Sequence, residues 1–331
     1  MTNQKSFGDL EYEGKKRTTK REKFLNIMEE IIPWDEWVEF VRPYYPKGER
    51  GRPPKEIETM LRMYLLQVWY SLSDEMLEDS IYDSQSMRRF VGINFLEENV
   101  PDATTLLKFR HMVEENGLSK QIFDAIKGVL VKCGRMMKEG TIVDATLIDA
   151  PSSTKNLKKE RDPEMKQTKK GNQWYFGFKS HVGVDAESGL VHSVETTAAN
   201  VHDVTMTAKL LHGEEKAVYG DSGYLGAEKQ EDIKGKIDEI KWNIALRRST
   251  IGKLPPEERE AAKAIEHKKA SIRAKVENPF HIIKNIFGFR KTRYRGIAKN
   301  HSLLYMLYVS ANLLMYARGS ANKPKLYPSR G

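Results

Sequence analysis

Three acidic residues, Asp144, Asp221 and Glu277, lie in sequence settings that ordinary surface or core residues do not explain. Asp144 is set into Gly140–Ile148, a β-branched apolar run that predicts a buried strand. Asp221 ends a second short apolar run and is followed at once by turn-forming residues, and Glu277 lies in a stretch of helical character. An isolated ionised carboxylate in an apolar strand is energetically expensive, so such residues are usually paired or bind a metal ion.

The chemistry that these acids favour is phosphoryl transfer. Two acids at strand ends and a third on a helix can converge on hard divalent cations, which prefer oxygen ligands. Two Mg²⁺ ions about 3.5–4 Å apart stabilise both the attacking and the leaving oxygen of an in-line displacement. Cutting a phosphodiester requires an activated water, and joining requires an activated 3′ hydroxyl. We therefore predict a carboxylate metal site that needs no His or Cys ligand.

The composition is compatible with a nucleic-acid partner. The chain of 331 residues has a formal net charge of +9, which favours a polyanion, although a basic balance alone is weak evidence. The single cysteine, Cys133, excludes an internal disulfide framework and a Cys-rich zinc site. The first residues lack the apolar segment of a signal peptide, and no apolar run approaches the about 18 residues of a membrane span. We expect a soluble, cytoplasmic protein.

The amino-terminal part of the chain has a helical pattern. Residues 1–19 are polar and basic and are predicted to form a flexible segment. From 20 to 138 the apolar spacing is helical almost throughout, and in 56–69 it predicts a helix with one apolar face. Strand alternation is not found here, so this half is predicted to be an all-helical domain.

After Gly140 the pattern changes to alternating strands and helices. Strands are predicted at 141–148, 174–184, 190–196, 217–220 and 242–246. Helices are predicted at about 204–211, 227–233, 256–269 and 271–287. Residues 300–317 are predicted to form an amphipathic helix with Leu303, Leu304, Leu307 and Leu314 inward. This order predicts a mixed α/β domain with a ribonuclease H-like core at 139–318, and 319–331 is predicted to be a disordered tail.

Several motifs resemble one known family, the DDE transposases of bacterial insertion sequences, and within it the IS-five group, which is related to the IS-four group. The resemblance covers nearly the whole chain and rests on Ile32–Trp34, Pro43–Pro46, Thr141–Thr146, Ala150–Lys155, Lys169–Tyr175, Thr196–Asp203 and Asp221–Tyr224. Its most specific piece is the spacing of Arg273, Glu277 and Lys284, which matches the family signature. A tyrosine that often stands three residues before the arginine is replaced by Ala270. This departure leaves the acids untouched and calls into question only the role of that tyrosine.

The resemblance implies an enzyme that binds the inverted-repeat ends of its element, cleaves DNA there and joins the 3′ hydroxyls to target DNA. Carried over by position, Asp144, Asp221 and Glu277 would be the catalytic, metal-binding triad, acting with Mg²⁺, for which Mn²⁺ would substitute. The helical half would be an end-binding domain for double-stranded DNA. Synapsis of two ends implies a homo-oligomer, a dimer or larger, and the protein would be associated with the bacterial nucleoid when bound to DNA.

Arg273 and Lys284 are candidate DNA contacts. They share one helix face with Glu277, where contact with DNA phosphate competes with a plain intrahelical ion pair. Pro279 lies within the same stretch and predicts a kink or a restart of the helix, with Asn278 as the cap of the second segment.

Four further basic residues are candidate DNA contacts. Lys169 and Lys170 belong to the lysine-rich stretch 155–170 that follows the Asp144 strand, where a solvated flexible loop and a contact with the DNA backbone are both open. Arg52 and Lys55 lie in the helical half and are candidates for contact with the inverted repeats. Strict helix-turn-helix spacing is not visible there, and many helical domains merely cap a core.

Other patterns favour structural roles. Asp203, preceded by His202, lies where a strand meets a helix and is predicted to cap the helix rather than to bind a metal. The aromatic residues within 174–178 are predicted to be strand and core residues rather than base-stacking platforms. Asp149 is predicted to begin the exit loop of the first strand. For Asp221 the competing interpretation is a turn aspartate.

Two other classes of function remain open. One is a domesticated DNA-binding regulator that has lost its chemistry, against which the intact triad argues. The other is a ribonuclease H-like nuclease that cuts without joining. A gel assay with end-containing DNA separates the three classes by showing binding alone, cutting alone, or cutting with joining.

Overall fold

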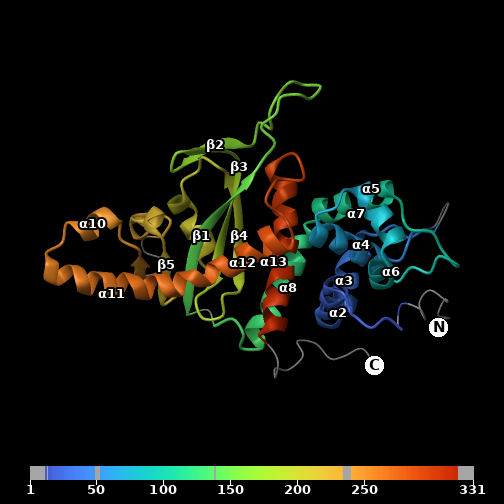
Figure 1. The fold of residues 1–331 in the computed structure, drawn as a ribbon, viewed down its shortest axis with the longest axis horizontal. Coiled ribbons are helices and arrows are strands. Elements are labelled where there is room, and N and C mark those ends of the chain that lie inside the picture. Colours follow the sequence, from blue (N-terminus) through green and yellow to red (C-terminus); the bar gives the residue numbers. More distant parts are fainter. Residues whose placement is uncertain (1–11, 13, 49–52, 138, 234–239, 320–331) are drawn as a thin grey trace. The chain divides into compact units, whose positions relative to one another are not determined.

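The computed structural model describes residues 12, 14–48, 53–137, 139–233 and 240–319 (Figure 1). The chain divides into two compact units, one formed by the residues up to Leu118 together with those from Leu313 onward, the other by Ser119–Asn312. Sequence analysis placed the end of the helical domain at 138. In the structure the boundary between the two units lies at Leu118, so the helix that begins there belongs to the unit that contains the sheet. The functional boundaries at 19, 138 and 318 stay a prediction.

The first unit is helical over its described residues, as predicted. Its helices are α2 (Lys20–Ile31), α3 (Trp34–Val41), α4 (Ile57–Tyr70), α5 (Asp74–Asp83), α6 (Gln85–Val91) and α7 (Ala103–Glu115), with a 3-10 turn η1 (Arg42–Tyr44). Helices α3, α5, α6 and α7 all contact α4. Every residue from Thr59 to Trp69 is therefore buried, and the single apolar face predicted for α4 is wrong because its neighbours cover all sides.

A buried cation in α4 helps to fix this helical core. The Arg62 guanidinium lies 4.1 Å from the Trp34 ring centroid. It donates hydrogen bonds to Glu58 at 2.7 Å, to Glu29 at 2.8 Å and to the Phe90 carbonyl at 2.7 Å. A charge in such a place is tolerated only when it is paired and hydrogen-bonded, so the network specifies how these helices meet.

The second unit is built on a mixed sheet, which confirms the predicted mixed α/β class. Its strands are β1 (Gly140–Asp149), β2 (Lys166–Lys170), β3 (Gln173–Asp185), β4 (Val191–Ala198), β5 (Ala217–Gly220) and β6 (Lys241–Ile244). The order is β2-β3-β1-β5-β6, and β4 also pairs with β3. The β1–β3 and β3–β4 pairs are antiparallel, whereas β1–β5 and β5–β6 are parallel. β1 thus joins the antiparallel and the parallel halves.

Strand β2 was missed by sequence analysis. Lys166–Lys170 contains no apolar residue and its side chains are mostly exposed, so it shows none of the alternation by which a half-buried strand is recognised. It forms because it pairs antiparallel with β3, with Lys169 opposite Trp174.

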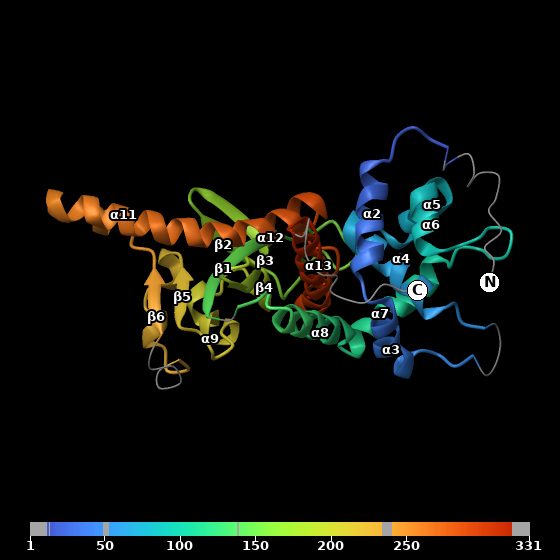
Figure 2. The same ribbon diagram turned by 90° about the horizontal axis from the view of Figure 1, so that it is seen from below.

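Helix α13 (Ile297–Arg318) packs on the antiparallel half of the sheet. The Tyr308 hydroxyl lies 2.9 Å from the Ser180 hydroxyl of β3, and Asn312 accepts from the Val191 N–H at 2.9 Å and donates to the Val191 carbonyl at 2.7 Å. Helix α8 (Leu118–Lys132) packs against α13 in turn (Figure 2). Residues 303–314 are all buried, so the prediction of an amphipathic helix with one inward face is wrong.

A long helical segment runs past the parallel half of the sheet (Figure 1). It consists of α11 (Pro256–Arg273), a 3-10 turn η5 (Ala274–Val276), α12 (Glu277–His281) and a π-helical turn η6 (Ile282–Ile286). The predicted restart capped by Asn278 is wrong, because the α-helix restarts at Glu277 with Val276 as N-cap and without a side-chain capping bond. Pro279 lies in the first turn of α12, where proline is tolerated. The segment changes from α to 3-10 and π geometry around it.

Shorter elements complete the sheet unit: η2 (Asp203–Met206), α9 (Thr207–Leu210), η3 (Ser222–Tyr224), η4 (Ala227–Lys229) and α10 (Arg248–Gly252). In the part of the chain that the structure describes, none of the helices has the length and apolarity required to cross a membrane.

Replacing Asn312 by alanine should lower the free energy of unfolding by about 2–4 kcal/mol, because the buried N–H and carbonyl of Val191 lose their partner. Urea unfolding measures the change. Met306→Leu, a volume-conserving substitution of another buried α13 residue, is the control and should cost less than about 1.5 kcal/mol. A loss for Asn312→Ala no larger than that of the control would contradict the proposed role of this side chain.

Candidate active site

The parallel pairing of β1 with β5 brings the first two acids together. Gly140 pairs with Ala217 and Ile142 with Tyr219, and the same register continued by two residues places Asp221 beside Asp144. Neighbouring strands lie about 4.8 Å apart. The two carboxylates therefore emerge side by side where β5 ends, at the carboxyl edge where open α/β sheets bind ligands.

Asp144 is held in a setting that disfavours its charge. Its Oδ1 accepts a hydrogen bond from the Ala145 N–H at 2.7 Å. Burial is the main reason that the pKa of Asp144 is raised to about 6; the charges of Asp221 and Glu277 act in the same direction, while the Ala145 bond and Arg273 oppose them. The pKa of Asp144 thus shows that the three acids and Arg273 share one electrostatic neighbourhood, although they come from three separate parts of the chain.

Asp221 combines a turn role with its place in the site. Its Oδ1 accepts from the Gly223 N–H at 2.8 Å, so it caps the short helix η3 as the turn interpretation predicted. This bond fixes the orientation of the carboxylate. The other oxygen, Oδ2, takes part in no hydrogen bond among the described residues, and is the atom that a ligand would meet.

Two lysines anchor the helical segment that carries Glu277. Lys275 donates to the carbonyls of Ala186 and Glu187 at 2.6 and 2.9 Å, beyond the carboxyl end of β3 and near the start of β1. Lys284 donates to the Leu147 carbonyl of β1 at 2.8 Å. Glu277 lies between these two anchors, so the segment carries it across β1 with its side chain exposed.

Arg273 provides a donor without an acceptor. Its Nε is buried and has no hydrogen-bond partner, and its charge lowers the pKa of Asp144. Among the described residues, Arg273, Glu277 and Lys284 form no ion pair with one another within 4.0 Å, so the plain intrahelical ion pair is not what the structure contains. A buried, unsatisfied N–H costs free energy, and a phosphate oxygen would satisfy it.

The acids fit a divalent cation in type but are not gathered around one. In the described part of the chain, no three His, Cys, Asp or Glu side chains stand close enough to hold one metal ion together. Like charges repel, so ionised carboxylates without a cation or a shared proton stay apart. Carboxylate oxygens are what Mg²⁺ and Mn²⁺ prefer, and the raised pKa of Asp144 marks a charge that lacks compensation.

The chain matches two family models. Residues 135–313 match the model described as Transposase DDE domain, and residues 13–112 match the one described as Transposase domain (DUF772). The first match spans more than half of the chain and includes all three acids. The chain belongs to the DDE transposase family. It is an enzyme of DNA transposition, and the two matches together support an insertion-sequence transposase.

A solved structure to which this transposase is similar is the cryo-EM structure of a piggyBac transposase synaptic complex with hairpin DNA. The TM-score is 0.44 at 11% sequence identity, over 92% of this chain and 76% of that chain.

One residue of the lysine-rich stretch of the transposase, Lys170, acts electrostatically on Lys284, and the DNA-contact role of the stretch stays a prediction. Burial lowers the pKa of Lys284, and the neighbouring charge of Lys170 lowers it further, while Glu277 raises it. Lys170 and Lys169 both lie on β2, and the Lys169 ammonium is 6.0 Å from the Trp174 ring centroid. Lys170 and Glu277 therefore both act on the charge of Lys284.

Of the two candidate DNA contacts in the helical half, the structure describes Lys55 but not Arg52. Lys55 is paired with Glu98 at 2.5 Å and donates to the Asn99 carbonyl at 2.9 Å, so a DNA phosphate would have to displace these partners. Arg52 lies outside the described residues.

Two structural assignments made from sequence are wrong in detail. Asp203 is the first residue of η2 rather than its cap, and the N-cap residue His202 makes no capping bond. Asp203 instead pairs with Lys179 at 2.9 Å and lies 3.7 Å from the His181 ring. Trp174 is 64% exposed and is not a core residue, although Phe178 on the same strand is fully buried.

Sequence analysis also missed Tyr224 as part of the site. Its ring is fully buried, and burial raises its pKa, with the charges of Asp144, Asp203 and Asp221 raising it further. The ring is thus the apolar floor beside the acids. The only sequence signal was its place in the short segment that follows Asp221.

Replacing Asp144 by asparagine should stabilise the transposase at neutral pH. The folded-state pKa of about 6 lies above the ordinary aspartate value of 3.8, so the favourable contribution of the protonated carboxyl is fully present below pH 3.8 and is lost as the pH rises through 6. Asp144→Asn should therefore gain up to about 3 kcal/mol above that window. Melting temperatures measured at low and high pH check this.

Asp149→Asn, which changes an exposed carboxylate at the end of the same strand, is the matched control and should show no such pH-dependent gain. Mg²⁺ or Mn²⁺ should raise the melting temperature of the wild type but much less that of Asp144→Asn, because a ligand of the folded state stabilises it by mass action. Equal pH profiles for the two asparagine variants would show that Asp144 carries no special electrostatic cost.

Proposed function

We propose that this transposase is a member of the IS-five group that binds the inverted-repeat ends of an insertion sequence and catalyses strand cleavage and strand transfer with Mg²⁺. The observation that carries the proposal is the register of β1 and β5, which sets Asp144 beside Asp221, together with the effect of Glu277 on Asp144. A mixed sheet with this arrangement supports a ribonuclease H-like catalytic core.

Asp144, Asp221 and Glu277 are the residues that would hold the divalent ions that DDE transposases use as cofactors. Two bound Mg²⁺ ions supply an activated oxygen nucleophile and stabilise the leaving oxygen. Asp221 presents one oxygen while the Gly223 N–H fixes the other. Glu277 approaches from a separate helical segment that Lys275 and Lys284 anchor across β1, so the site is completed from both sides.

Arg273 would orient the scissile phosphate. Its buried Nε already lacks a partner, so a non-bridging phosphate oxygen would meet a donor that needs no reorganisation. Lys284 would add a second positive charge on the same side while it holds the Leu147 carbonyl. Lys169 and Lys170 on β2 would extend this contact along the DNA backbone.

The helical domain at 20–138 would recognise the double-stranded ends, with Arg52 and Lys55 as candidate contacts. Transposition joins two ends to one target, so two active sites must meet, and we propose a homo-oligomer of at least two chains in the synaptic complex.

Asp144→Asn, Asp221→Asn and Glu277→Gln should each reduce Mg²⁺-dependent cleavage and joining by several orders of magnitude, because each removes a metal ligand. The changes are nearly isosteric, so binding of end-containing DNA should survive. Cleavage and strand transfer on labelled end DNA measure the loss, with Asp149→Asn as the control that keeps activity. A variant that cuts at the wild-type rate removes that residue from the proposed triad.

The same assay separates the competing functions. Wild-type protein that binds ends but does not cut in Mg²⁺ or Mn²⁺ would be a regulator. Protein that cuts at the ends but forms no joined product when 3′ hydroxyl ends and target DNA are supplied would be a nuclease.

Arg273→Ala and Lys284→Ala should weaken DNA binding and reduce its salt dependence. Each lost phosphate contact lowers the slope of log affinity against log salt by about 0.9. Arg273→Ala should lower the melting temperature less than Lys284→Ala, because its Nε has no protein acceptor to lose, whereas Lys284→Ala removes the bond to Leu147. A drop in melting temperature with an unchanged salt slope would mean that the residue is purely structural.

A further inference from the structure

The chain after Glu277 carries no acidic residue to its end. Its next part contains the cations Lys284, Arg290, Lys291, Arg293, Arg295 and Lys299. Four of these cations lie within residues 290–296, which we call the 290–296 segment. Sequence analysis gave this segment no role, and the candidate active site does not use it.

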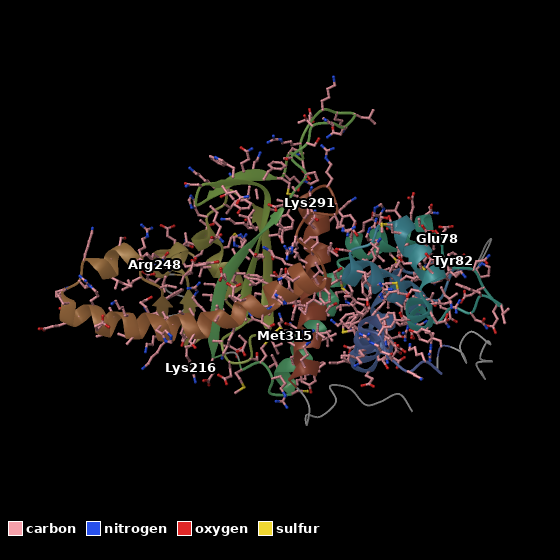
Figure 3. The ribbon with its side chains drawn as sticks, in the orientation of Figure 1. Glu78, Tyr82, Lys216, Arg248, Lys291 and Met315 are labelled. Carbon is pink, nitrogen blue, oxygen red and sulfur yellow. The ribbon has the colours of Figure 1, made fainter. Side chains whose placement is uncertain are left out.

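The 290–296 segment lies along the end of β1. Asp149 forms a parallel bridge with Lys291, the Asp149 N–H donates to the Arg290 carbonyl at 3.2 Å, and the Thr292 N–H donates to the Asp149 carbonyl at 2.7 Å. Figure 3 shows Lys291 at the opposite end of the sheet from Lys216. The cations of this segment are therefore fixed on the same strand that carries Asp144.

The loop between β1 and β2, residues 151–165, faces the segment and uses two of its acids to hold it. The Gly296 N–H donates to Asp162 Oδ2 and the Ile297 N–H donates to Glu164 Oε2, both at 2.7 Å. These carboxylates satisfy backbone N–H groups at the start of α13, where helix geometry favours negative charge. The two acids therefore fix the segment through its backbone and leave its arginine side chains without a carboxylate.

The loop and the segment enclose a pocket of about 250 Å³. Its lining includes the cations Arg161, Arg293 and Arg295 and the acids Glu160 and Asp162, of which Asp162 is bound to the Gly296 N–H. Within the described residues, the side chains of Arg293 and Arg295 have neither a hydrogen-bond acceptor nor an ion-pair partner. Burial lowers the pKa of Arg293, against the opposing effect of Tyr294, so this guanidinium is partly withdrawn from water.

Like charges crowd at this end of the sheet. Lys170 and Arg290 both act against the charge of Lys284, although they come from segments far apart in the sequence. Repulsion between cations is expected on a surface that binds a polyanion. Each phosphate contact neutralises a cation and so reduces the repulsion.

We propose that the 290–296 segment and the facing loop 151–165 bind the sugar–phosphate backbone of duplex DNA, on the arm that leads away from the scissile bond. The inference rests on the proposed function for the position of that bond. Lys291 pairs with Asp149, five residues along β1 from Asp144, which is about 17 Å. At about 3.4 Å per base pair, Lys291 lies about five base pairs from the cleavage site, and Arg293 and Arg295 meet phosphates at that distance or farther along the arm.

The test is the salt dependence of binding to a duplex, in the Asp144→Asn background so that cleavage plays no part. The double variant Arg293→Ala with Arg295→Ala should lower the slope of log affinity against log salt by about 1.8, since two phosphate contacts are lost. The matched control is Lys132→Ala with Lys216→Ala, which removes the same charge at residues outside this surface and should leave the slope nearly unchanged. Arg293→Lys with Arg295→Lys keeps both charges and should restore most of the slope.

A slope for the arginine variant that equals the control's would overturn the inference, provided that both proteins melt alike. Hydroxyl-radical footprinting on end DNA then locates the contact, and protection should be lost at about five or more base pairs from the cut and kept nearer to the cut. Loss of protection at some other position would contradict the placement. Failure of the proposed transposition chemistry is distinct, because it would show as uncut DNA with the wild type while the slope difference persists.

Discussion

The parallel pairing of β1 with β5 is the constraint on which the site depends. It is short, yet its register sets Asp144 beside Asp221 and leaves the remainder of β1 to be covered by Lys284 at Leu147 and by Lys291 at Asp149. A slip by one residue would turn Asp144 to the opposite face. On its other side β1 is held by the long antiparallel pairing with β3. This pairing fixes the position of β1, and the short pairing with β5 depends on it.

Changes of helical pitch allow one continuous segment both to bind the sheet through its lysines and to keep Glu277 exposed. From α11 to η6 the backbone passes through α, 3-10, α and π geometry, and π turns inside helices are frequent at functional sites. Lys275 and Lys284 reach carbonyls at different levels of the sheet while Glu277 stays exposed between them. A uniform α-helix would rotate these side chains by a fixed angle per residue, and Pro279 would kink it. The altered pitch interrupts the regular α-helical hydrogen bonds and lets both lysines reach the sheet while Glu277 stays exposed.

Features with strong local signals were predictable from sequence. The apolar run around Asp144 gave β1, and helical spacing gave the amino-terminal unit. The predicted single inward face of α13 was wrong, because its apolar residues are spread around the whole helix and residues 303–314 are all covered. β2 carries no apolar residue, so its pairing with β3 alone makes it a strand. Asp203 was expected to serve its own helix, but Lys179, brought alongside by folding, competes for its carboxylate. The triad roles and the DNA contacts remain predictions.

The packing of α13 has a consequence for how the enzyme is made. β1 is synthesised long before Lys284, Lys291 and Asn312, which secure β1 and β4. At about 5–20 residues per second, roughly ten to thirty seconds separate the emergence of the first acid from that of the helix that covers its sheet. The nascent chain thus carries its acids on an incomplete sheet during that time, and the candidate active site is assembled only after α13 has been made.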